Sequence, residues 1–103
     1  IEFEKDPEGF GIIQLDSRES FDEDDRYEKW KEQGKKDHYT NFPLAFEDAA
    51  GDHYIPRSSG VKAGGVTEYH NLVITSRANN LRKGNMGGDD FKKLLYEEMK
   101  QAA

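Results

Sequence analysis

Apolar residues recur at helical spacing near both ends of the chain. Between residues 21 and 33, Tyr27 and Trp30 fall on one face, and acidic residues fill the first turn. Ser20 and Glu23 have the spacing of a capping box, in which the two side chains satisfy free backbone amides at the helix start. The pattern predicts a helix over residues 21–33.

The final stretch, residues 87–103, is amphipathic. Its apolar residues occupy one helical face: Phe91, Leu94, Leu95 and Met99. An aspartate near its start can cap a helix. We therefore expect a C-terminal helix whose apolar face packs against the helix that contains Trp30.

Short apolar runs in the middle of the chain predict two strands. The first runs from Gly51 to Ile55 and is closed by a proline, and the second spans residues 69–75. The Gly- and Ser-rich residues 57–68 between them predict a loop, and a short helix that ends before Gly84 follows the second strand. We expect Ile55 to face the core.

Two other stretches leave the choice of structure open. Apolar residues at 12–15 follow a proline and two glycines, which is compatible with either a short strand or a covering arm. Residues 35–50 combine turn-forming residues with aromatic ones, which is compatible with either a loop or a short hairpin.

The composition limits the class of protein. The chain has 103 residues, of which 34% are hydrophobic and 12% aromatic, enough for one small domain. It has no cysteine, so neither disulfides nor a thiolate zinc site can support the fold. No apolar run approaches the ~20 residues needed to cross a bilayer, and no basic stretch precedes an apolar run as in a signal peptide, so we expect a soluble, cytoplasmic protein without a membrane partner. Because the first residue is Ile1, the domain is compatible with an origin in a longer polypeptide.

The net charge of −6 is unevenly distributed. Residues 1–51 contain seven Lys and Arg against fifteen Asp and Glu, whereas residues 52–85 contain five against two. A basic segment favours contact with a nucleic-acid backbone. The candidate contacts are therefore the five basic residues of the second segment: Arg57, Lys62, Arg77, Arg82 and Lys83.

Polar residues that can bind a metal ion or transfer a proton lie in the two predicted strands and in the short helix that follows them. Asp52 and Asn80 carry hard oxygen ligands of the kind that Mg²⁺ accepts, usually one or two per site. His53 can remove a proton from water near neutral pH, and the amide carbonyl of Asn71 can orient it by accepting the other ring N–H. This set of residue types suggests metal-assisted hydrolysis of a phosphodiester, with Arg82 or Lys83 binding a flanking phosphate.

The motif "DHYIPRSSG", followed by "GG" and then "HNLVITSRANNLRKGN", resembles the core of HNH endonucleases, which have the ββα-metal fold. The resemblance covers residues 51–85 and implies a single α+β nuclease domain. Residues 1–50 would then form an N-terminal arm, a helix and a knuckle, and residues 86–103 a C-terminal helix. The resemblance implies DNA, or alternatively RNA, as partner and Mg²⁺ or Mn²⁺ as cofactor.

Four residues match the family's positions for first metal ligand, general base, middle asparagine and last ligand: Asp52, His53, Asn71 and Asn80. Asn79 competes with Asn80 for the last role because both lie in the same predicted helix. The Lys-Gly-Asn motif at residues 83–85 favours Asn80. His38 and His70 are interpreted as structural or surface histidines, because a lone histidine beside aromatic residues or at a strand entrance is more often one of these.

Many HNH proteins bind a structural zinc ion through four cysteines, which this chain lacks. By alignment with the motif, those positions here are Asp37, Thr40, Ser76 and Asn79. We therefore expect no structural zinc, and we expect aromatic packing to hold the knuckle through Tyr39, Phe42 and Phe46.

Two alternatives stay open. The same fold can serve as a non-catalytic module that binds nucleic acid or another partner. The domain can also be the nuclease part of a larger defence or restriction protein, in which a fused or separate module supplies the target specificity. The intact set of Asp, His and two Asn residues favours the catalytic interpretation.

Overall fold

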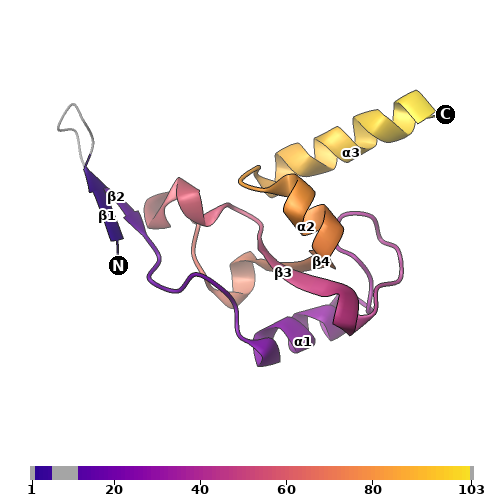
Figure 1. The fold of residues 1–103 in the computed structure, drawn as a ribbon, viewed down its shortest axis with the longest axis horizontal. Helices are drawn as coiled ribbons and strands as arrows, with labels where there is room; N and C mark the ends of the chain where they lie inside the picture. Colours follow the sequence, from indigo (N-terminus) through magenta and orange to yellow (C-terminus); the bar gives the residue numbers. More distant parts are fainter. Residues whose placement is uncertain (1, 6–11, 103) are drawn as a thin grey trace.

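The computed structural model describes residues 2–5 and 12–102 (Figure 1). The fold is α+β, as predicted. The elements of these residues are three α-helices, α1 (Glu23–Glu32), α2 (Arg77–Lys83) and α3 (Gly88–Ala102), and four strands, β1 (Glu2–Lys5), β2 (Ile12–Leu15), β3 (Ala49–His53) and β4 (Leu72–Ser76).

The four strands form two antiparallel pairs. β1 pairs with β2 in a hairpin that lies at one edge of the molecule, and β3 pairs with β4 in its middle (Figure 1). Of the two possibilities for residues 12–15, the strand is therefore the one observed. Residues 35–50 form mostly loop, with one isolated bridge between Lys36 and Pro43.

Helix α1 begins two residues later than predicted. Its N-cap is Asp22, whose side chain accepts a hydrogen bond from the Asp25 amide, so Ser20 does not cap it. A carboxylate in this position also interacts favourably with the positive end of the helix dipole. At the other end of the helix, the Trp30 indole N–H donates to the carbonyl of Leu44 at 2.7 Å, which fixes α1 to the loop that follows it.

The central sheet separates two groups of side chains because successive residues of a strand point to opposite faces. One face carries Leu72 and Ile74, which are fully buried and form the core with Phe21 and Ala49. Partly buried residues of α1 and the loops pack against this cluster: Trp30, Leu44, Phe46 and Tyr69. The opposite face carries Asp52, which stands across from Val73 in the register.

The strand boundaries differ from the prediction. β3 begins and ends two residues earlier than predicted, at Ala49 and His53. Ile55 lies beyond its end, with 38% of its surface exposed. Ile55 therefore does not face the core. Residues 69–71 form a single helical turn before β4, because Asn71 donates its backbone N–H to Glu68 rather than to a strand partner.

The loop between β3 and β4 contains two short helical turns, Arg57–Ser59 and Val61–Ala63. Steric constraints in this loop explain why residues 64 and 65 are both glycine. Gly64 has φ of +93°, a conformation that residues with a side chain rarely adopt. A Cβ on Gly65 would lie 2.2 Å from the carbonyl oxygen of Pro56, so the chain can pass this point only with hydrogen as the side chain.

Helix α3 does not pack on α1 as predicted; the two helices lie on opposite sides of the central sheet (Figure 1). Instead Phe91 of α3 is fully buried, and its ring meets that of Tyr39 edge-on at 5.1 Å. Phe42 is 69% exposed, so it does not hold the knuckle together. No helix in the described part of the chain has the length and apolar composition needed to span a membrane.

Candidate functional site

A polar cavity of about 250 Å³ lies where β3 ends, beside α2 and the loop that precedes α1. The three residues predicted for metal binding and proton transfer at this cavity, Asp52, His53 and Asn80, line it together with Arg57, a predicted nucleic-acid contact. The other lining residues are Glu19, Ser20, Gly51, Pro56, Gly84 and Asn85. Asp52 and His53 are neighbours on β3 and Asn80 comes from α2, so the fold brings together residues that are far apart in the sequence.

Asp52 is buried, with 4% of its surface exposed, and two donors hold its carboxylate. The Tyr39 hydroxyl donates to Oδ2 at 2.6 Å, and Lys83 Nζ donates to Oδ1 at 3.0 Å. Burial and the bond to Asp52 raise the pKa of Tyr39, so the phenol keeps its proton and remains a donor. Lys83 is itself buried and also donates to the carbonyl of His53 at 3.0 Å.

The imidazole of His53 is half-buried. Its Nε2 lies 2.8 Å from the hydroxyl of Thr67, and its ring packs against that of Phe21 with centroids 4.5 Å apart. Burial lowers the pKa of His53, and the neighbouring Asp52 carboxylate partly offsets this effect. The ring is therefore held on one edge and packed on one face.

Asn71 has partners other than the one predicted. Its Oδ1 accepts the backbone N–H of Ile55 at 2.9 Å, and its Nδ2 donates to the carbonyls of Ile55 and Val66 at 3.0 and 2.9 Å. The amide thus closes the loop between β3 and β4, while Thr67 contacts the imidazole of His53. Sequence reasoning missed Thr67, and no local pattern marks it.

The structure gives the two neighbouring asparagines different environments. Asn79 donates its amide to the buried carboxylate of Asp37 at 3.1 Å, which fixes it away from the cavity lining. The side chain of Asn80 lines the cavity and makes no hydrogen bond to any described residue, so its carbonyl oxygen is available to a ligand. Of the two candidates for the last ligand, Asn80 is therefore the one at the polar cavity.

The five predicted nucleic-acid contacts do not form one patch. Arg57 lines the cavity, and its guanidinium donates to the carbonyl of Asp16 at 2.9 and 2.6 Å. Lys83 lies behind Asp52 and is not accessible to a phosphate in this conformation. Arg82 pairs with Glu98 on α3, and Arg77 lines a separate hollow beside α1.

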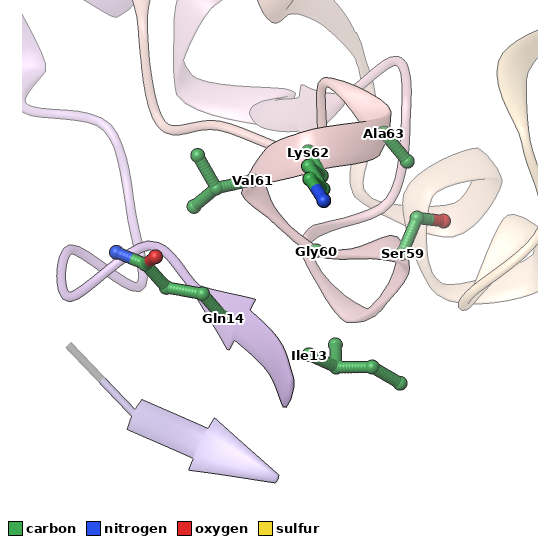
Figure 2. Close-up of a pocket in the computed structure, with 7 residues that line it drawn as sticks. All are labelled: Ile13, Gln14, Ser59, Gly60, Val61, Lys62 and Ala63. Atoms are coloured by element: carbon green, nitrogen blue, oxygen red, sulfur yellow. The ribbon is translucent and has the colours of Figure 1, made fainter. Parts of the chain in front are cut away.

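Lys62 belongs to a second cavity, of about 420 Å³, between β2 and the turn at residues 59–63 (Figure 2). Its lining consists of Ile13, Gln14, Ser59, Gly60, Val61, Lys62 and Ala63. Neither a carboxylate nor an imidazole lines this cavity.

The residues around the polar cavity fit a magnesium-type ion. In the part of the chain that the structure describes, no group of three His, Cys, Asp or Glu side chains is arranged to hold a metal. Mg²⁺ commonly takes only one or two protein oxygens and fills its other positions with water and phosphate oxygens. Asp52 and Asn80 would be the residues to supply such a pair, since each oxygen of Asp52 has one protein donor and retains a free lone pair.

Comparisons with protein-family models, with curated proteins and with solved structures find no match for this chain. The candidate site therefore rests on its own residues and geometry.

Proposed function

We propose that this chain is a divalent-metal-dependent HNH endonuclease that hydrolyses phosphodiester bonds of DNA, with β3, β4 and α2 as its ββα-metal core. One observation carries the proposal. Asp52, His53 and Asn80, selected from the sequence for their chemistry, line the same polar cavity. A carboxylate, an imidazole and an amide oxygen around one cavity suit the hydrolysis of a phosphate ester.

In this proposal His53 accepts the proton of the attacking water. The neighbouring Asp52 and the Asn80 amide hold the divalent ion, Mg²⁺ or Mn²⁺. The chemistry that a bound ion supplies is stabilisation of negative charge on the phosphate and on the leaving oxygen. The packing of the His53 ring against Phe21 restricts its orientation, so the base is positioned before substrate arrives.

Two basic residues act at different distances from the substrate. Arg57 reaches the cavity from the start of the loop and can bind a flanking phosphate with the guanidinium N–H groups that Asp16 does not occupy. Lys83 instead stabilises the buried charge of Asp52 and ties it to the backbone of His53. The role of Lys83 is thus to hold the metal ligand in place.

The experiment is nicking of supercoiled plasmid in Mg²⁺, in Mn²⁺ and in EDTA. We expect cleavage with either metal, none in EDTA, and a loss of at least about 100-fold in His53→Ala, the usual contribution of a general base. His70→Ala is the matched control, because His70 is exposed and does not line the cavity. Full activity of a folded His53→Ala variant would contradict the proposal, and metal-independent DNA binding without cleavage would support the binding-module alternative.

The two asparagines provide a second contrast. Asn80→Ala should lose activity and keep its stability, because its side chain bonds to no described residue. Asn79→Ala should lose stability, because it removes a donor to Asp37. The opposite pattern would move the ligand role to Asn79.

A further inference from the structure

We propose that Thr67 is a positioning residue for His53: its hydroxyl, bonded to the carbonyl of Arg18, fixes the imidazole in the Nε2–H tautomer and leaves Nδ1 as the basic nitrogen. This inference rests on the proposed role of His53 as general base. It assigns to Thr67 the orienting role that the sequence suggested for Asn71.

The tautomer follows from counting protons. The Thr67 hydroxyl lies 2.5 Å from the carbonyl oxygen of Arg18 and 2.8 Å from Nε2 of His53. A carbonyl oxygen can only accept, so the single hydroxyl proton of Thr67 is donated to Arg18. The hydroxyl oxygen then has only lone pairs to offer to His53, and Nε2 must carry the proton that joins them.

The other ring nitrogen is free for chemistry. Nδ1 of His53 makes no hydrogen bond to a described residue. Among the buried side-chain nitrogens and oxygens of that part of the chain, only Nε2 of His38 lacks a partner, so Nδ1 of His53 reaches solvent. Since His53 lines the polar cavity, the lone pair of Nδ1 is the one available to a water molecule.

Thr67 is itself rigidly held. It is 1% exposed, and its backbone N–H donates to Oδ2 of Asp16 at 2.9 Å. The Arg18 guanidinium donates to the carbonyl of Thr67, and the Arg18 amide donates back to Asp16 at 2.9 Å. The segment 16–18 therefore holds Thr67 through its backbone N–H, its carbonyl and its hydroxyl.

The first test is ¹⁵N NMR of the imidazole in the wild-type protein at a pH of about 8, where a histidine of ordinary pKa is neutral. We expect Nε2 of His53 to carry the proton and Nδ1 to be unprotonated. A spectrum with the proton on Nδ1 overturns the inference. This measurement does not depend on nuclease activity, so it separates a failure of the inference from a failure of the proposed function.

The second test compares Thr67→Ser with Thr67→Val. Serine keeps the hydroxyl and should keep both the tautomer and the activity. Valine keeps the shape but removes the hydroxyl, so we expect mixed tautomers and a kcat for plasmid cleavage lower by roughly 10- to 100-fold with little change in KM, as for other residues that orient a catalytic group. Wild-type tautomer and kcat in Thr67→Val would overturn the inference.

A double variant guards against a purely structural effect of Thr67→Val. Added to His53→Ala, Thr67→Val should cause no further loss of kcat, because the residue acts only through His53. A further loss of the same size as in the wild-type background would show that Thr67 acts on the fold rather than on the base. If Thr67→Val fails to fold, the wild-type tautomer and the Thr67→Ser rescue still decide the question.

Discussion

The side-chain amide of Asn79 donates to Oδ2 of Asp37 at 3.1 Å, across 42 positions of the chain. The resemblance to HNH proteins implies that both residues, like Thr40 and Ser76, take the places of zinc-binding cysteines. The backbone amides of Thr40 and Ser76 donate to the same carboxylate at 3.4 and 3.0 Å. Asp37 also accepts from the Tyr39 amide and the Thr75 hydroxyl, each at 2.8 Å. A buried carboxylate thus joins the loop at residues 37–40 to the start of α2, as a structural metal would.

We expect Asp37→Ala to lower the free energy of unfolding by about 3 kcal/mol or more, because it leaves several buried donors without an acceptor. Asp37→Asn should fall between this variant and the wild type, since one amide oxygen remains. The measurement is urea denaturation, with the exposed Asp48→Ala as control. Equal midpoints for Asp37→Ala and Asp48→Ala would show that the carboxylate does not hold the knuckle.

Lys83 and Arg82 are neighbours that both pair with an acid, but only Lys83 does so in the interior. Lys83 and Asp52 have side-chain exposures of 1% and 5%, whereas Arg82 and Glu98 are both 44% exposed. Removing one partner of a buried ion pair leaves an uncompensated charge. We therefore expect Lys83→Met to lose about 3–5 kcal/mol of stability in metal-free buffer.

Arg82→Met is the control for this variant, and its denaturation midpoint should stay close to that of the wild type, because exposed pairs contribute little. A midpoint for Lys83→Met equal to that of Arg82→Met would mean that Asp52 does not depend on the ammonium group.

The sequence predicts those features of the fold that depend on local pattern. The apolar triplet 72–74 begins strand β4, and the amphipathic repeat around Phe91 forms a helix with Phe91 buried. Asp52, His53 and Asn80, which the sequence groups by their chemistry, also lie at one cavity.

The details that failed depend on partners far along the chain. Thr67 approaches His53 because the segment 16–18 holds it. Arg18 and Thr67 are 49 positions apart in the sequence. Similarly, the packing of α3 against Tyr39 rather than Trp30 follows from the side of the sheet on which α3 lies, which the spacing of apolar residues does not specify. Local periodicity identifies a buried face but not the surface that buries it.

The adjacent glycines at the start of α3 offer a steric test. A Cβ on Gly88 would lie 2.3 Å from a ring carbon of Tyr54, whereas one on Gly87 would lie 3.8 Å from its nearest neighbour, a flexible carboxylate. The Gly88 amide also donates to the carbonyl of Tyr54 at 2.7 Å, so the backbone cannot easily move away. We expect Gly88→Ala to cost about 1–3 kcal/mol of stability, and Gly87→Ala to change it by less than about 0.5 kcal/mol. Thermal or urea denaturation of the two variants checks this, and similar losses in both would contradict the steric explanation.

His38 should make the stability of the fold depend on pH. Its Nε2 is buried without a hydrogen-bond partner among the described residues, and its ring meets those of Tyr39 and Tyr54 edge-on. Burial, and then the charge of Lys92, lower the pKa of His38 in the folded state, so the folded protein binds its proton less readily than the unfolded chain. A group of this kind contributes its full stability above the unfolded pKa of about 6.5 and loses it as the pH falls below that value.

We therefore expect the free energy of unfolding to decrease between pH 7 and pH 5, because the unfolded state takes up a proton that the folded state excludes. His53, whose pKa is also lowered, adds to the decrease, so the informative quantity is the difference in slope between the wild type and His38→Gln. The slope should be shallower in His38→Gln and unchanged in the control His70→Gln, which alters an exposed histidine. Equal slopes in all three proteins, from urea denaturation at each pH, would show that the folded state accepts the proton on His38 without cost.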